Sequence, residues 1–254
     1  MKNKLDVDID KDNPQSTVSN MNNPLTNEKE ICQFYENEIR RAISESKSNT
    51  ERALGGVLRS IKGTLVADIT EAIVKIAWMK KGGSPYVIKF DQAREILCVK
   101  ESYIKRQKNP AVREYLNSNR KEGFGFSVDK HVFIDGELVL GIECKAYAEN
   151  AMLKRILFDF DLLKQNHPDM NCALVQLESM LGGDYANGKE FQLGSIKSHA
   201  LMSQFDYDLN IITLLEGERK VNEPVHDPKH LKTLEPKLVR IAIERIKGLL
   251  PNPH

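Results

Sequence analysis

Residues 126–145 read FSVDKHVFIDGELVLGIECK, and this stretch carries the clearest indication of the fold. Its two halves, Phe126–Ile134 and Glu137–Lys145, are rich in β-branched and aromatic residues, which favour strands. The dipeptide Asp135-Gly136 between them is a strong signal for a tight turn. The stretch therefore predicts a β-hairpin. Leu138–Ile142 is almost continuously apolar, as in a strand buried on both faces, so we expect the second strand to be central in a sheet.

Charged residues follow the apolar part of the second strand. Because side chains alternate across a strand, Glu143 and Lys145 share one face, whereas Cys144 points to the other face and is expected to pack in the core. A carboxylate or an ammonium at the end of a buried strand is costly unless it is paired or binds a metal. Asp129 on the first strand supplies a second carboxylate if the hairpin brings it to Glu143.

The register of the hairpin decides whether Asp129 can join Glu143. A two-residue loop at Asp135-Gly136 pairs Asp129 with Ile142, on the face away from Glu143. A three-residue loop over 135–137, or a bulge near Asp129, places Asp129 opposite Glu143. Three-residue hairpin loops with a glycine bulge are common, so we predict the longer loop or the bulge.

Two carboxylates and a lysine are the groups that phosphodiester hydrolysis requires. Asp129 and Glu143 can hold Mg²⁺ with oxygen ligands and leave positions for water and a phosphate oxygen. The metal stabilises the charge that develops on the phosphate and acidifies the attacking water. Lys145 can position that water or help to deprotonate it.

The string Val128-Asp129, thirteen further residues and Glu143-Cys144-Lys145, on a hairpin that a helix follows, resembles the PD-(D/E)xK nuclease superfamily. Length and layout look most like a type II restriction endonuclease. The resemblance implies a Mg²⁺-dependent enzyme that cuts double-stranded DNA at a specific short site, usually as a homodimer. It also implies that Asp129 and Glu143 bind the metal and that Lys145 assists the water. Val128 stands where the family often has proline.

Many members of the family carry a further glutamate on the preceding helix. Glu71, in the segment VADITEAI (66–73), is the candidate for this position, and Asp68 is the second choice. The resemblance implies that this carboxylate supports the metal or its water.

Periodic apolar residues predict the remaining elements. We expect a helix that begins near residue 27 and extends through Ile43, further helices over about 50–79, 150–164 and 235–250, and strands over 171–177 and 209–215. This order predicts an α/β fold of the restriction-endonuclease type, with a mixed β-sheet core flanked by helices and a helical N-terminal part. Residues 1–26 lack periodic apolar positions and are expected to form a disordered tail. Residues 27–254 are expected to form one nuclease domain, helical over 27–81 and catalytic over about 82–254.

Composition excludes some classes of protein. The 254 residues carry 37 Lys and Arg against 36 Asp and Glu, so the chain is no histone-like polycation. No apolar run approaches the roughly 18 residues of a membrane helix, and the N-terminus has no apolar stretch of a secretory signal. The four cysteines are widely spaced and form no CxxC pair, which points to a cytoplasmic protein with reduced thiols.

Several alternatives remain open at this stage. Asp208, Glu218 and Lys220 form a rival acid–acid–lysine set after another apolar strand. A structural salt bridge between Glu143 and Lys145 is the other alternative. The alternative functions are those of a repair or junction nuclease of the same superfamily and of a nucleic-acid-binding protein without catalytic activity. The segment Gly183–Lys189 imitates a phosphate-binding loop, but Glu190 stands where Ser or Thr would meet Mg²⁺, so we expect no nucleotide cofactor.

Basic residues outside the hairpin suggest contacts to phosphate. The segment 94–121 holds eight Lys or Arg and three Glu, which fits either a phosphate-contacting arm or a solvated helix face. The same two interpretations apply to four further residues, namely Lys154, Arg155, Arg219 and Lys220.

Overall fold

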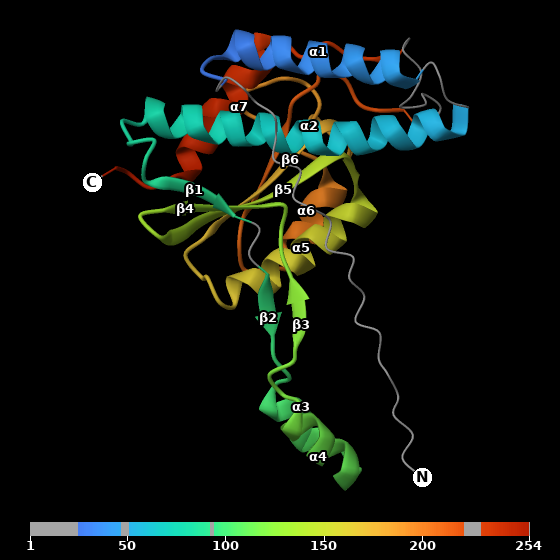
Figure 1. Ribbon diagram of the computed structural model, residues 1–254, viewed down its shortest axis with the longest axis vertical. Coiled ribbons are helices and arrows are strands. Elements are labelled where there is room, and N and C mark those ends of the chain that lie inside the picture. The colour runs from blue at the N-terminus through green and yellow to red at the C-terminus, as the bar shows by residue number, and fades with distance from the viewer. Residues whose placement is uncertain (1–24, 47–50, 92–93, 221–229, 254) are drawn as a thin grey trace.

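The computed structural model describes residues 25–46, 51–91, 94–220 and 230–253 (Figure 1). The expected disordered tail over 1–26 therefore lies almost entirely outside the described residues. The helices are α1 (Glu28–Ser46), α2 (Glu51–Lys80), α3 (Glu101–Arg106), α4 (Pro110–Ser118), α5 (Asn150–Lys164), α6 (Ile196–Met202) and α7 (Pro236–Leu249). The strands are β1 (Ile88–Asp91), β2 (Glu95–Leu97), β3 (Phe124–Phe126), β4 (Lys130–Ile134), β5 (Glu137–Glu149), β6 (Asn171–Met180) and β7 (Leu209–Thr213).

A five-stranded sheet in the order β1-β4-β5-β6-β7 forms the centre of the described chain. The β1, β4 and β5 strands pair antiparallel, whereas β5, β6 and β7 pair parallel, so the sheet is mixed. Helices α1, α2 and α7 cover one face, and α5 with α6 covers the other (Figure 1). This arrangement confirms the predicted α/β fold with a central hairpin. Among the described helices, none is both long and apolar enough to cross a lipid bilayer.

Each face of the sheet carries its own apolar core. Ile142 and Cys144 of β5 lie in the core that α2 covers, so the prediction that Cys144 packs in the core is confirmed. Leu174 of β6 lies in the core that α5 covers. Because Leu174 is the register partner of Glu143, the Glu143 side chain emerges on the α5 face.

The hairpin reaches the required register by a different route from the longer loop that we predicted. Asp135 and Gly136 have φ angles of 52° and 87°, which form a two-residue turn, so the three-residue loop is wrong. The register instead shifts between Val132 and Phe133, where a bulge leaves one extra residue in β5. Lys130 then pairs with Ile142, and the preceding residue, Asp129, adjoins Glu143. The alternative prediction of a bulge is correct, although the bulge lies at Val132 and Phe133, farther along the strand than Asp129 itself.

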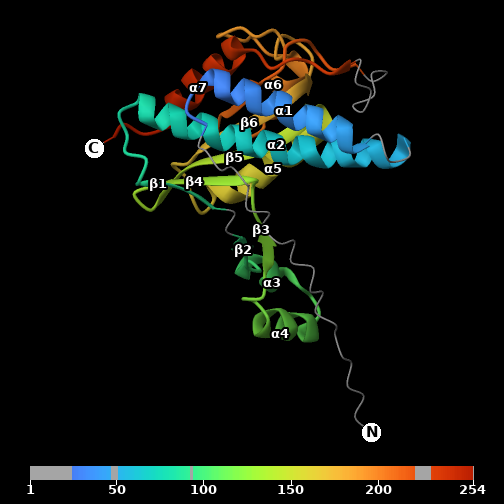
Figure 2. The ribbon, with the colours of Figure 1, turned by 45° about the horizontal axis from the view of Figure 1, so that its top comes forward.

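The structure also corrects the predicted first strand and adds elements that the sequence did not predict. Residues 127–129 interrupt the strand expected over 126–134, which divides into β3 and β4. The β2 and β3 strands form a separate two-stranded sheet, and the chain between them forms α3 and α4. Figures 1 and 2 show this part projecting from the body of the protein, and we call residues 94–126 the arm.

Two glycines, Gly63 within α2 and Gly83 just after its end, should respond to alanine substitution with opposite changes in stability. A Cβ at Gly83 would overlap the buried Trp78 ring, whereas a Cβ at Gly63 would meet no atom within 4 Å. We expect Gly83→Ala to lower the free energy of unfolding by about 1–3 kcal/mol through overpacking. Gly63→Ala, within the helix, should raise it by about 0.5–1 kcal/mol. Urea unfolding of both variants measures the two changes, and equal effects would contradict this account.

Candidate active site

Three charged side chains converge where β4 begins beside β5. The Lys145 Nζ lies 2.6 Å from Glu143 Oε1 and 2.9 Å from Asp129 Oδ2. The ammonium therefore lies between two carboxylates that come from neighbouring strands. The structure thus brings together three of the four side chains that the sequence singled out, namely Asp129, Glu143 and Lys145.

Backbone amides hold both carboxylates in place. The Cys144 N–H donates to Asp129 Oδ2 at 2.8 Å, and the Asp129 N–H donates to Glu143 Oε2 at 3.2 Å. Each acid is thus fixed by the main chain of the other strand or its extension. Such hydrogen bonds to ionised groups are among the stronger ones, so the two carboxylates have a defined separation before any ligand arrives.

Burial and mutual repulsion control the charge of this cluster. Burial raises the pKa of Glu143, and the nearby Asp129 charge raises it further, against the opposing effect of Lys145. Burial by itself would lower the pKa of Lys145, but the two carboxylates outweigh it and raise that pKa. Two acids and one ammonium leave one net negative charge, which attracts a cation.

The donor set fits a magnesium ion that keeps part of its water shell. The Glu143 side chain is only 11% exposed, whereas Asp129 is 38% and Lys145 is 30% exposed, so the cluster opens to solvent on one side. Across the described ranges, His, Cys, Asp and Glu do not gather in threes around a possible metal position. Two carboxylates with open positions suit Mg²⁺, which dehydrates reluctantly and accepts water and phosphate oxygens.

Glu71 does not join the three side chains. Its carboxylate binds Lys75 at 2.8 Å and Lys130 at 3.1 Å, and these two lysines lower its pKa although burial opposes the change. Lys130 is the register partner of Ile142, so Glu71 lies toward the α2 face of the sheet, away from Glu143. The second candidate, Asp68, lines with Glu71 a cavity of about 870 Å³ beside β1.

The rival set of acids does not assemble. Asp208 directly precedes β7, whereas Glu218 follows the end of this strand and accepts a hydrogen bond from the Gly182 N–H at 3.0 Å. A strand of five residues is about 17 Å long, so the two carboxylates lie at opposite ends of it. Glu218 therefore serves the loop after β6 rather than a site with Asp208.

The chain is 45% identical over 203 residues to the type II restriction enzyme DdeI of Desulfomicrobium norvegicum. The alignment covers 79% of this chain and 85% of that enzyme. No family model matches the chain.

The chain belongs to the type II restriction enzymes. It is therefore a site-specific deoxyribonuclease, and the prediction of a restriction endonuclease is confirmed. Membership in this family argues against the alternative of a nucleic-acid-binding protein without catalytic activity.

The segment that imitates a phosphate-binding loop has another conformation in this restriction enzyme. After β6 the chain continues without a helix until α6 begins at Ile196, so no helix opens at Glu190. The Asp184 carboxylate instead accepts hydrogen bonds from the N–H groups of Leu193 and Gly194, which join the two ends of the loop. A strand–loop–helix arrangement for nucleotide phosphates is not formed here.

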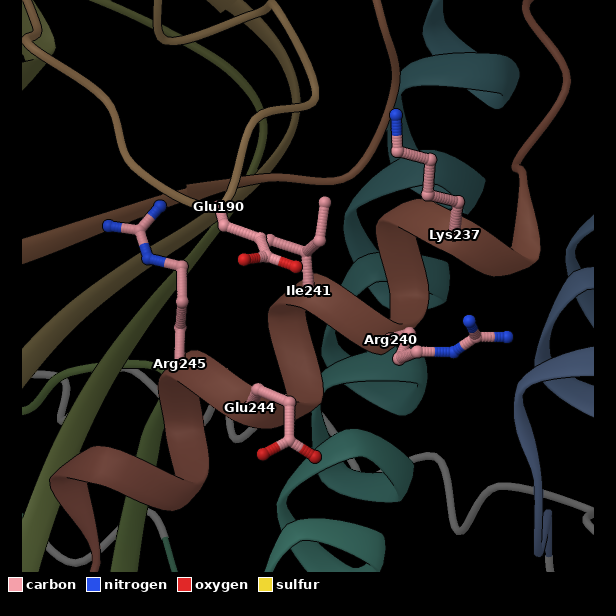
Figure 3. A pocket seen from close by; sticks show the side chains of 6 residues that line it. All are labelled: Glu190, Lys237, Arg240, Ile241, Glu244 and Arg245. Atoms are coloured by element: carbon pink, nitrogen blue, oxygen red, sulfur yellow. The ribbon is translucent and has the colours of Figure 1, made fainter.

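A second cavity of the enzyme lies between this loop and α7. It has a volume of about 590 Å³ and is lined by Glu190, Lys237, Arg240, Ile241, Glu244 and Arg245. Figure 3 shows Glu190 next to Ile241, while the Lys237 and Arg240 side chains extend away from it. The charged groups do not converge on one point, so this cavity lacks the arrangement of a catalytic site.

Gln176 is a residue beside the candidate active site that the sequence did not single out. It is fully buried on β6 and is the register partner of Lys145. Its Nε2 donates to Thr213 Oγ1 at 3.0 Å, and its Oε1 has no hydrogen-bond partner among the described residues. A glutamine inside the apolar run CALVQL (172–177) was the signal that could have revealed it.

A second charged cluster surrounds Glu178, farther along β6. Its buried carboxylate binds Lys232 at 3.2 Å and Arg219 at 3.3 Å, and Lys62 of α2 lies at 3.9 Å. The Arg219 guanidinium also lies over the Tyr147 ring at 4.6 Å. Arg219 is therefore engaged inside the protein rather than lining a groove, while Lys154 and Arg155 are exposed on α5.

We expect Glu178→Ala to destabilise the enzyme by about 3–5 kcal/mol, because three cations would lose their buried counter-charge. Glu244→Ala is the matched control, since Glu244 pairs with Lys247 at 3.1 Å on the surface and should contribute about 0.5 kcal/mol or less. Urea unfolding at neutral pH gives both values. A loss at Glu178 as small as that at Glu244 would show that the cluster does not hold β6 to α2.

Proposed function

We propose that this restriction enzyme is a PD-(D/E)xK nuclease that uses Mg²⁺ to hydrolyse phosphodiester bonds in double-stranded DNA at a specific short site. Asp129, Glu143 and Lys145 are its catalytic residues in this proposal. The observation that supports it most is the convergence of the two carboxylates and the ammonium within hydrogen-bond distance, at a place that solvent reaches.

Asp129 and Glu143 would hold the magnesium ion, which when bound acidifies water and offsets charge on the phosphate. The amides of Asp129 and Cys144 keep the two carboxylates oriented, so little reorganisation is needed at the moment of reaction. Lys145 is an ammonium beside the open side of the cluster. Its ammonium donates hydrogen bonds to Asp129 and Glu143. From this position it would orient the attacking water and balance the negative charge of the scissile phosphate.

Glu71 has an indirect role in this proposal. It binds Lys130, the residue after Asp129, and so holds the beginning of β4 to α2. This contact would position Asp129 rather than touch the metal or its water.

We further propose that the enzyme acts in the cytoplasm as a homodimer on a palindromic site. A twofold protein matches a twofold DNA sequence, and this symmetry is common among oligomeric enzymes. Sedimentation of the purified protein with and without duplex DNA would measure the oligomeric state.

Substitutions that remove one charge test the catalytic assignment. We expect Asp129→Asn, Glu143→Gln and Lys145→Met each to lower the rate of DNA cleavage by at least about 100-fold. Glu137→Gln, an exposed residue of the same strand, is the matched control and should cleave normally. Glu71→Gln should lower the rate less than tenfold because its effect is transmitted through Lys130.

The assay is digestion of phage DNA with Mg²⁺, with and without EDTA. Discrete fragments that disappear with EDTA support a metal-dependent site-specific nuclease, and sequencing the fragment ends gives the site. Full activity of Glu143→Gln would overturn the assignment, and a loss in Glu71→Gln as large as in Glu143→Gln would give Glu71 a direct role.

Metal binding can be measured apart from cleavage. We expect Mn²⁺ or Mg²⁺ to raise the melting temperature of the wild-type protein, because a ligand that binds the folded state stabilises it. The double variant Asp129→Asn/Glu143→Gln should lose this rise. Lys145→Met should show a larger rise than the wild type at equal metal concentration, since the competing ammonium is gone. An unchanged rise in the double variant would place the metal elsewhere.

A further inference from the structure

The arm carries a positive charge that the rest of the chain does not share. Its segment 94–121 contains eight of the 37 Lys and Arg but only three of the 36 Asp and Glu, so it carries about five positive charges on a chain of net charge +1. All eight basic residues are exposed, and they are Arg94, Lys100, Lys105, Arg106, Lys108, Arg113, Arg120 and Lys121. The remainder of the chain is correspondingly acidic.

Burial of apolar surface does not explain why the arm carries helix α4. Helix α4 has no buried residue, and Tyr115 on it is 65% exposed. The helix is nevertheless well defined, since the Asn109 side chain accepts the Ala111 N–H and Pro110 occupies its first turn. Helix α4 lies in the part of the arm that projects from the body, and because it adds nothing to the core it offers surface for a partner (Figures 1 and 2).

The arm is anchored at its base, close to the end of α5. Glu95 accepts hydrogen bonds from Asn166 at 3.2 Å and pairs with His167 at 3.0 Å. Lys100 donates to Gln165 Oε1 at 3.1 Å. These contacts fix the direction of the arm while the helices α3 and α4 extend beyond them.

The same arm is continuous with the candidate active site. Strand β3 ends at Phe126, and the chain reaches Asp129 three residues later. Phe126 and Val128 are 7% and 2% exposed, so buried side chains tie this connection to the body. The arm therefore ends within three residues of the carboxylate at which the proposed function places a scissile phosphate.

We propose that the arm is a DNA-binding element that contacts the phosphate backbone beside the scissile bond. The inference rests on the proposed nuclease function and adds to it the surface that holds the substrate. DNA is favoured as the partner because its charge is complementary to the arm, whereas the arms of two copies would repel each other. Lysines and arginines on exposed helices suit phosphate contacts, which position the enzyme without reading the sequence.

The test removes three charges from the arm and three from the opposite part of the protein. The arm variant is Lys108→Gln/Arg113→Gln/Lys121→Gln. The control variant is Lys29→Gln/Arg40→Gln/Lys237→Gln, with three exposed residues of α1 and α7. Fluorescence anisotropy with a labelled duplex of 30 base pairs in EDTA measures binding without cleavage, over a series of salt concentrations.

We expect the arm variant to bind the duplex about tenfold more weakly at moderate salt, because contacts to phosphate are lost. The slope of log affinity against log salt should fall by up to about 2.7 in magnitude, since each lost contact removes about 0.9. The control variant should keep the wild-type slope. Equal slopes for the arm variant and the wild type would overturn the proposal.

A footprint on the wild-type protein avoids any effect of the substitutions on folding. Acetylation of lysines, followed by mass spectrometry, should show Lys105, Lys108 and Lys121 protected by the duplex, while Lys29 and Lys237 react as before. If DNA leaves the arm lysines fully reactive, the arm does not contact DNA.

Two further readouts separate the possible failures. Absence of metal-dependent cleavage by the wild type would reject the nuclease mechanism, whereas the binding measurements would still decide the role of the arm. If the arm variant instead loses self-association in sedimentation and keeps its affinity for DNA, the arm binds a second copy of the chain and the proposal is wrong.

Discussion

The ion-paired cluster of Asp129, Glu143 and Lys145 depends on how β4 is registered against β5. A one-residue slip would turn Asp129 to the opposite face, where its charge would meet the apolar core under α2. The bulge at Val132 and Phe133 prevents this slip. A type II restriction enzyme cuts a phosphodiester bond at a defined place, so the groups that act on the bond must have fixed positions. The sheet, the helices and the two cores together hold β4 and β5 in this one register.

Much of the fold follows from the sequence because its long elements have strong apolar periodicity. The bounds of α5 agree with the prediction, and α2 continues through Gly63 because tertiary contacts outweigh the weak helix preference of glycine. Short elements were missed for the opposite reason. The strands β1 and β2 and the helix α6 have too few residues to show a period, and partners distant in sequence decide their conformation.

The candidate site was predictable in its residues but not in its construction. The spacing of Asp129, Glu143 and Lys145 on a hairpin pointed to a nuclease. A sequence does not show where a β-bulge shifts the pairing of two strands, so the length of the hairpin loop was predicted wrongly. Glu71 illustrates another limit. Its position on the preceding helix fits the family pattern. In this structure, however, its carboxylate binds Lys130, whose side chain lies on the face of the sheet opposite to Glu143.

The bulge has a consequence for the tip of the hairpin. The one-residue register shift that brings Asp129 beside Glu143 arises at the bulge between β4 and β5. The turn at Asp135-Gly136 therefore does not produce this shift. The tip is exposed and connects two strands whose alignment is fixed farther along. Natural variation in length, or a short inserted peptide tag, can therefore be accommodated at this reversal without moving the two acids of the candidate site.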